Sequence, residues 1–202
     1  MLFIKIKNLK RFFLKQKILL LFYKYRGILL GIFGILLLLS EPTKNDFSVS
    51  GLFLILIGIC IRICARRSIG SHSRKNKLDA PFLITSGIYS VVRHPLYLSN
   101  GLICSGFILL HLHWQTYTFY FAFALWTFLG ILILNEDLFL QKKFGEEWNI
   151  YAKRTPAVFP AFPLKVKSFV FQKSIFQSFC SDLWTWFFIL LYAILLVLRR
   201  AF

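Results

Sequence analysis

The sequence predicts an all-α integral membrane protein with about five transmembrane helices, and three observations lead to this class. Of its 202 residues, 57% are hydrophobic and 18% are aromatic, which exceeds the composition of ordinary soluble domains. Long uncharged runs such as GILLGIFGILLLLS and WTWFFILLYAILLVL are typical of membrane helices. The formal charge of +17 is concentrated between these runs, whereas a nucleic-acid-binding protein carries its cations on a polar surface. We therefore expect a membrane partner and no nucleic acid.

Five apolar segments are the candidate helices. They are Gly27 to Leu39, Phe47 to Cys64, Leu96 to Leu112, Thr116 to Leu134 and Leu183 to Leu198. A helix needs about 20 residues to cross a bilayer, so the first segment is long enough only if the residues from Ile18 onward are included. For the last segment the sequence leaves three possibilities open: it spans the membrane, lies at the interface or re-enters.

The distribution of cations predicts the orientation. Lys and Arg number eight up to Arg26, seven from Arg62 to Arg93 and seven from Lys142 to Lys173, against three elsewhere. Loops that stay in the cytoplasm carry the excess of positive charge. We therefore expect the N-terminus and both long loops to be cytoplasmic, in a bacterial inner membrane or the endoplasmic reticulum.

The two long polar stretches, Ala65 to His94 and Asn135 to Asp182, then face the same compartment. They flank the hairpin of the third and fourth segments, so a cofactor site is expected where they meet. The chain divides accordingly into three regions. These are a basic segment with two membrane helices (residues 1–80), a core that carries the motifs (81–163), and a basic linker with the last apolar helix (164–202).

The triplet Arg93-His94-Pro95 precedes the third segment. Proline restricts the residue before it to extended conformations and is favoured in the first turn of a helix, so Pro95 is predicted to begin this helix. Unpaired helix amides, the helix dipole and the Arg93 guanidinium would together attract an anionic group, and Tyr97 adds a ring and a hydroxyl nearby. The alternative is an arginine that snorkels and a tyrosine at the membrane interface.

Two adjacent carboxylates, Glu136 and Asp137, follow the fourth segment. Carboxylates at such a depth are costly unless they are paired or bind a cation. A helical pattern continues after them, and we expect Gly145 to interrupt it and Pro156 to end it.

These stretches together resemble a known family. TSGIYSVVRHPLYL, followed some forty residues later by EDLFLQKKFGEEWNIYAKRTPAVFP, closely resembles the membrane methyltransferases that comprise isoprenylcysteine carboxyl methyltransferases and phospholipid N-methyltransferases. The resemblance covers Phe82 to Pro160 and implies S-adenosylmethionine (SAM) as cofactor. By position, it implies cofactor contacts at Leu83, Ile84, Tyr89, His94, Pro95, Leu96, Tyr97, Glu136 and Asp137. Arg93, Glu136 and Arg154 are the residues expected to act in catalysis.

Three positions depart from the family pattern. Ser99 replaces a glycine, which could crowd a close backbone approach. The acidic pair is Glu-Asp where the family has Glu-Glu. Leu132 stands where the prenylcysteine enzymes have a substrate-binding arginine, so the implied cofactor site carries over better than the implied substrate.

Methyl transfer from a sulfonium is an in-line displacement that depends on alignment and needs no metal. A carboxyl group, whose ordinary pKa is about 4, or a phosphate is already ionised at neutral pH and requires no base. An amine acceptor would require Glu136 or Asp137 as general base. Arg93 and Arg154 favour an anionic acceptor, although a cytoplasmic boundary would carry such charges in any case. We therefore predict O-methylation of a carboxyl or phosphate group on a lipid-like or lipidated acceptor in the membrane.

Three other functions remain open at this level. The first is methylation of a phospholipid amine. The second is an NADPH-dependent sterol or steroid reductase, because those enzymes share an RHPxY motif and a GxxWxxY pattern like that of Gly145, Trp148 and Tyr151. The third is a membrane scaffold without catalysis. No residues have the spacing of metal ligands, and the sequence decides neither the acceptor nor the oligomeric state.

Overall fold

The computed structural model describes residues 21–42, 48–69, 82–161, 166 and 171–201, and within these ranges all regular structure is helical. The predicted all-α class is thereby confirmed for this part of the chain. Residues 1–20, which include most of the N-terminal basic segment and the first three residues of the predicted helix extension, lie outside the described residues. The rest of that extension is described: residues 21–24 are helical, and a turn at Tyr25 separates them from the helix that begins at Arg26.

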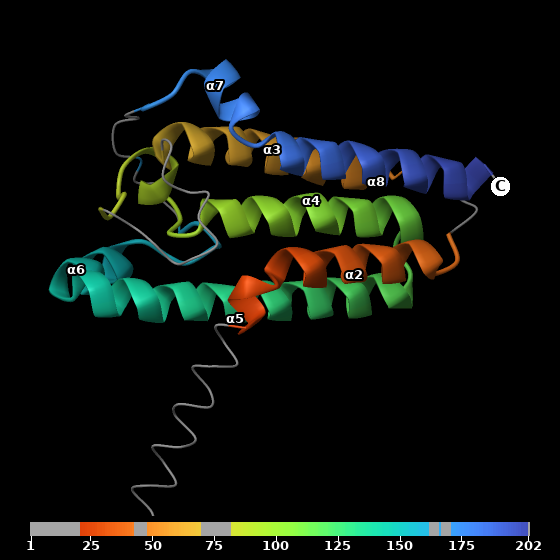
Figure 1. The fold of residues 1–202 in the computed structure, drawn as a ribbon. Helices are drawn as coiled ribbons and strands as arrows, with labels where there is room; N and C mark the ends of the chain where they lie inside the picture. Colours follow the sequence, from red (N-terminus) through yellow and green to blue (C-terminus); the bar gives the residue numbers. More distant parts are fainter. Residues whose placement is uncertain (1–20, 43–47, 70–81, 162–165, 167–170, 202) are drawn as a thin grey trace, which may run out of the picture.

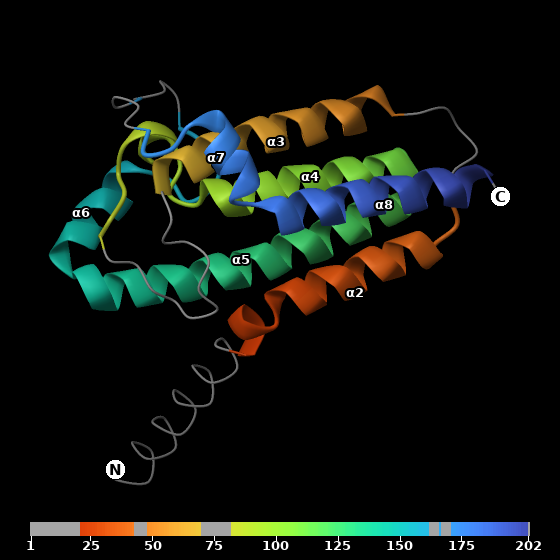
Figure 2. The same ribbon diagram turned by 45° about the horizontal axis from the view of Figure 1, so that its top comes forward.

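In the described part of the chain, five long helices form a bundle in which α4 lies between α3 and α5 (Figure 1 and Figure 2). Their bounds are α2 Arg26–Leu39, α3 Val49–Ile69, α4 Pro95–Leu112, α5 Thr116–Phe144 and α8 Leu183–Ala201. The short helices η2 (Gly87–Ser90), α6 (Glu146–Arg154) and α7 (Ile175–Cys180) gather at the end of the bundle where α3 and α5 finish. The described parts of the two polar stretches predicted to meet therefore lie at one end of the bundle.

Among the described residues, three helices are long and apolar enough to cross a membrane: α3, α4 and α5, with mean hydropathies of 2.1, 1.4 and 1.9. The apolar parts of α2 and α8 are shorter. These features support the predicted integral membrane class, and the number of five transmembrane helices stays a prediction. In α4, 67% of the apolar window is buried inside the protein, against 28% in each of the other two, so α4 is the central helix.

Small residues bring α3 and α4 together. A Cβ added to Gly51 would lie 2.7 Å from the Gly106 carbonyl oxygen, and one added to Gly58 would lie 3.0 Å from the Ser99 carbonyl oxygen. Glycine at such positions lets two helix backbones approach closely. Ser99 is fully buried in this contact. The close approach at Ser99, which replaces the family glycine, is therefore made possible by Gly58 on the opposing helix.

Local sequence signals account for the helix ends near the motifs. Pro95 is the first residue of α4, as predicted. The fourth segment continues as helix beyond Leu134 to Phe144, because the residues that follow contain no helix breaker. Gly145 then adopts a φ of 54°, which glycine tolerates, and α6 begins directly after it. Consequently Glu136 and Asp137 project from a continuous helix.

Candidate active site

The chain before α4 and the chain after α6 are joined by backbone hydrogen bonds. The N–H of Arg93 donates to the Pro156 carbonyl at 2.8 Å, and the N–H of His94 donates to the Ala157 carbonyl at 2.9 Å. Pro156 follows the C-cap of α6, Thr155, which is extended as a residue before proline usually is, so the helix ends there and the carbonyls of Pro156 and Ala157 are available for this pairing. The RHP triplet and the end of the second polar stretch thus form one rigid unit.

Asp137 lies between the side chains of Arg93 and His94. Its Oδ2 is 3.0 Å from Arg93 Nη2, and its Oδ1 is 2.6 Å from His94 Nε2. The His94 side chain is only 2% exposed, against 20% for Asp137. Because a carboxylate can only accept hydrogen bonds, both partners donate to it.

The Arg93 guanidinium has further partners within the protein. Its Nη1 donates to the Ala152 and Thr155 carbonyls at 2.9 and 2.8 Å, and its Cζ lies 5.4 Å from the centre of the Trp148 ring. These carbonyls belong to the last turn of α6 and its C-cap, where a cation is favourable. The anionic group that the sequence led us to expect near Arg93 is therefore present in the chain itself, as Asp137.

Glu136 faces a different set of residues from Asp137. The Tyr97 hydroxyl hydrogen-bonds to the Glu136 carboxylate, which also acts electrostatically on Tyr89 and Tyr23. Burial raises the pKa of Tyr89 well above its ordinary value, and the charge of Glu136 raises it further. The hydroxyl of Tyr89 therefore stays protonated at neutral pH.

Tyr23, just before α2, was not among the predicted site residues. The Arg26 guanidinium lies 4.0 Å from the centre of its ring and forms a cation–π contact. The spacing of three residues on one helical turn was the only signal in the sequence. The residues at the start of α2 thus add an aromatic ring and a cation to the surroundings of Glu136.

The start of α4 leaves backbone donors available. Its N-cap residue, His94, makes no side-chain cap hydrogen bond, and Pro95 at the first position has no N–H. The N–H groups of Leu96 and Tyr97 have no acceptor within the helix, because the first turn has no preceding carbonyls. An anionic carboxylate fits such a helix start.

A cavity of about 460 Å³ opens between α5 and α6. Its lining combines apolar and polar side chains: Arg93, Leu134, Asp137, Leu138, Gln141, Trp148, Asn149, Ala152 and Lys153. Asp137 lines this cavity, and Glu136 does not. Of the two neighbouring carboxylates, only Asp137 therefore lines this cavity.

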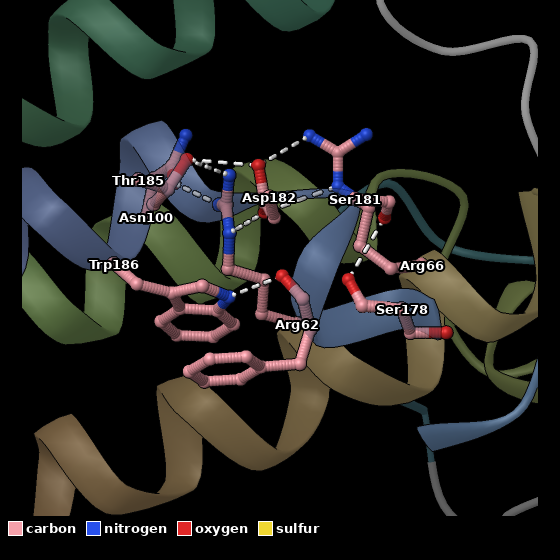
Figure 3. Close-up of polar contacts among 9 residues, drawn as sticks. Arg62, Arg66, Asn100, Ser178, Ser181, Asp182, Thr185 and Trp186 are labelled. Atoms are coloured by element: carbon pink, nitrogen blue, oxygen red, sulfur yellow. Dashed lines mark hydrogen bonds and ion pairs between the residues drawn. The ribbon is translucent and has the colours of Figure 1, made fainter. Parts of the chain in front are cut away.

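A second buried ionic cluster, which the sequence did not lead us to predict, lies at the same end of the bundle (Figure 3). Asp182 accepts hydrogen bonds from both Arg62 and Arg66, and Arg62 also donates to Asn100 at 2.6 Å and Thr185 at 2.9 Å. Burial alone would raise the pKa of Asp182, but the two guanidiniums outweigh it and hold that pKa below its ordinary value. This cluster joins α3, α4 and the start of α8. An arginine inside an apolar segment was the signal that could have revealed it.

Comparison with known proteins decides the family. The sequence model of a family described as phospholipid methyltransferase matches residues 47–147, which is half of the chain. The chain belongs to the phospholipid methyltransferase family. The predicted resemblance to membrane methyltransferases is confirmed. No solved structure gave a significant match.

Several relatives carry a more specific name. The chain is 31% identical to a protein-S-isoprenylcysteine O-methyltransferase of Xenopus laevis over 56% of this chain and 40% of that protein. It is 32% identical to the human protein of the same name, over 56% of this chain and 41% of that protein. It is 33% identical to a probable protein-S-isoprenylcysteine O-methyltransferase of Oryza sativa subsp. indica, over 61% of this chain and 67% of that protein. The chain thus spans about two fifths of the length of the two vertebrate relatives.

Within this phospholipid methyltransferase family member, contacts connect some of the predicted cofactor residues: His94 with Tyr97 and Asp137, and Glu136 with Tyr97. Tyr89 accepts a hydrogen bond on its carbonyl from the Tyr151 hydroxyl at 2.6 Å, which holds η2 against α6. Leu83 and Ile84, half-buried, precede η2 in the chain. Arg154 is exposed at the end of α6, and within the described ranges no hydrogen bond joins it to Arg93. The roles assigned to Leu83, Ile84, Tyr89 and Arg154 stay predictions.

Leu132 stands where the prenylcysteine enzymes have a substrate-binding arginine, and the structure shows its surroundings. Leu132 is 1% exposed and belongs to the main hydrophobic core with Leu125 and Leu129. This phospholipid methyltransferase family member therefore has a buried apolar side chain at that position.

Proposed function

We propose that this protein is a SAM-dependent methyltransferase that O-methylates a carboxyl or phosphate group on a lipid-like or lipidated acceptor within the membrane. Family membership and the names of the relatives support the reaction class. The observation that carries the proposal is the convergence of Glu136, Tyr97 and His94 on the uncapped start of α4.

The residues around the start of α4 fit SAM. The free N–H groups of Leu96 and Tyr97 suit its carboxylate, and Glu136 suits its ammonium group or its ribose hydroxyls. The ring of Tyr97 lies 5.8 Å from that of His94, and these aromatic faces suit an adenine base.

When bound, SAM would supply a methyl group on a sulfonium. The acceptor oxygen forms a bond to the methyl carbon while the bond from that carbon to sulfur breaks. The contribution of the chain is alignment and exclusion of water, which its buried aromatic side chains provide.

The anionic acceptor is supported by the relatives, which are named O-methyltransferases. Arg93 is a weaker argument for it than the sequence indicated, because Asp137 and two carbonyls already balance its charge. The site lies at the end of the bundle with the basic last turns of α3 and α5, which hold Arg66, Arg67, Lys142 and Lys143. We therefore propose that it faces the cytoplasm.

Methylation of a phospholipid amine is the second candidate, because the family description names phospholipid as the acceptor class. In that reaction the amine must lose a proton. Glu136, which accepts from the Tyr97 hydroxyl and borders the cofactor residues, is then the general base.

The test is transfer of radiolabelled methyl from SAM into the lipid and protein fractions of membranes that contain the protein. Glu136→Gln is compared with Glu147→Gln, an exposed carboxylate on α6 that serves as the matched control. We expect base-labile, organic-extractable label in the wild type and the control, and almost none in Glu136→Gln. Base-stable label would move the acceptor to nitrogen. Absence of label, with absence of SAM binding, would contradict the proposal and direct attention to NADPH or to a scaffold.

A further inference from the structure

The two adjacent carboxylates on α5 have different partners. Glu136 accepts from the Tyr97 hydroxyl and acts on Tyr89. Asp137 divides its two oxygens between His94 and Arg93. Neighbouring residues on a helix point about 100° apart, so the two carboxylates reach different residues at the start of α4: Asp137 contacts the N-cap His94, and Glu136 contacts Tyr97.

The surroundings of Asp137 are built to hold it in place. Arg93 is fixed by the two α6 carbonyls at 2.9 and 2.8 Å, and the backbone of both Arg93 and His94 is hydrogen-bonded to the chain after α6. The ring of His94 also contacts the rings of Tyr97 and Trp148, with centroids 5.8 and 6.4 Å away. Asp137 therefore meets a histidine whose backbone and ring faces are already constrained.

We propose that Asp137 is a positioning residue, which sets the orientation and the tautomer of His94 for the cofactor and does not itself contact SAM. This inference rests on the proposed function. It reassigns Asp137 from the cofactor contacts that the family resemblance implied.

The chemistry of the hydrogen bond defines the tautomer. The Asp137 carboxylate only accepts, so the ring nitrogen that faces it, Nε2, carries a hydrogen. In the neutral ring the other nitrogen, Nδ1, is then an acceptor. Nδ1 is then the ring nitrogen of His94 that can accept a hydrogen bond from a ligand.

An Asp137→Asn substitution should reverse this arrangement. Arg93 can only donate, so it takes the single oxygen of the amide, and the amide NH₂ turns toward His94. Nε2 must then accept, and the hydrogen moves to Nδ1. Asp137→Glu keeps two acceptor oxygens and the charge on a longer side chain, so it should retain the tautomer with a displaced ring.

The experiment combines two measurements on purified protein in detergent micelles. Histidine ¹⁵N NMR reports which ring nitrogen carries hydrogen, with His94→Gln to assign the signal, and titration with SAM gives Kd. For Asp137→Asn we expect the His94 hydrogen on Nδ1 and a Kd raised about 10- to 100-fold, the scale that misplacing a binding group by about 1 Å produces. Asp137→Glu should recover part of the affinity, and the control Glu147→Gln should match the wild type.

The outcomes are distinguishable. A wild-type Kd in Asp137→Asn, or a His94 ring that keeps its hydrogen on Nε2, would overturn the positioning role. If Asp137→Asn yields no folded protein, Asp137→Glu decides: unchanged SAM affinity overturns the proposal, and weakened affinity with an unchanged tautomer supports it. Failure of the wild type to bind SAM would instead overturn the proposed function, and the histidine spectrum would still report whether Asp137 sets the ring.

Discussion

Two buried clusters at the same end of the bundle place one aspartate between two nitrogen-bearing side chains. In the first, Asp137 joins Arg93 and His94; in the second, Asp182 joins Arg62 and Arg66. The Asp137 side chain is 20% exposed and lines a cavity, whereas the Asp182 side chain is 6% exposed and links three helices. The same chemistry therefore serves the candidate site in one place and the assembly of the bundle in the other.

The two clusters also differ in what remains if the aspartate is removed. Arg93 would keep its two carbonyl acceptors, and His94 is uncharged in one of its protonation states. Arg62 and Arg66 would keep their charges in a buried setting without a counterion. We therefore expect the Asp182 cluster to control stability and the Asp137 cluster to control binding.

Replacing Asp182 with Ala should have the largest effect and tests directly whether the Asp182 cluster contributes more to stability than the Asp137 cluster. Removing one partner of a buried ion pair costs about 3 to 5 kcal/mol, because an uncompensated charge stays buried. We expect a loss of that size in the free energy of unfolding, measured by thermal or denaturant unfolding in detergent micelles. Asp137→Ala should lose clearly less; equal losses from both variants would remove the distinction between the clusters.

Gly58→Ala tests the helix contact next to the Asp182 cluster. The new Cβ would lie 2.7 Å from Ile103 Cγ1 and 3.0 Å from the Ser99 carbonyl oxygen, which forces α3 and α4 apart. Overpacking of this kind costs about 1 to 3 kcal/mol. The matched control is Gly31→Ala, because a Cβ there has nothing within 4 Å. Unfolding temperatures of the two variants check the prediction, and equal values would show that the close approach does not matter.

Arg93→Lys tests whether the Asp137 cluster contributes to methyl transfer. Lysine keeps the charge but lacks the planar fork that reaches Asp137 and two α6 carbonyls together. We expect kcat/KM for methyl transfer to fall about tenfold, which corresponds to about 1.4 kcal/mol, with a smaller change in stability. Lys142→Arg, at an exposed position on α5, is the control. A variant with normal kcat/KM would show that charge alone is sufficient at this position.

The smallest effect concerns pH and belongs to the Asp182 cluster. The pKa of Asp182 is lower in the folded protein than in the unfolded chain, because Arg62 and Arg66 outweigh the effect of burial. Its stabilisation is therefore complete above the unfolded pKa of about 3.9 and is lost as the pH falls through the folded value. We expect the wild type to lose stability in this acid range and Asp182→Asn to show a flatter profile, measured as unfolding temperature against pH. Parallel profiles for the two proteins would contradict the dependence of stability on the ionisation of Asp182.

The sequence by itself determined the helical class and the local geometry of the motifs. Pro95 begins α4 and Gly145 ends α5, because proline fixes its own φ and glycine tolerates a positive one. The run of apolar segments and the order of the two motifs indicated the family, which the comparisons confirmed. Each helix end and each motif depends on residues close together in the chain, and the order of the motifs is read directly from the sequence.

Only the tertiary structure decided which side chains meet. Arg62 and Asp182 are 120 residues apart, and no local pattern pairs them. Helical periodicity states that Glu136 and Asp137 point in different directions, but the rotation of α5 against α4 and α6 decides that Asp137 faces His94. That rotation results from the packing of many distant apolar side chains, including Leu125, Leu129 and Leu132. For this reason the sequence could propose residues for the candidate site but could neither divide their roles nor add Tyr23 to them.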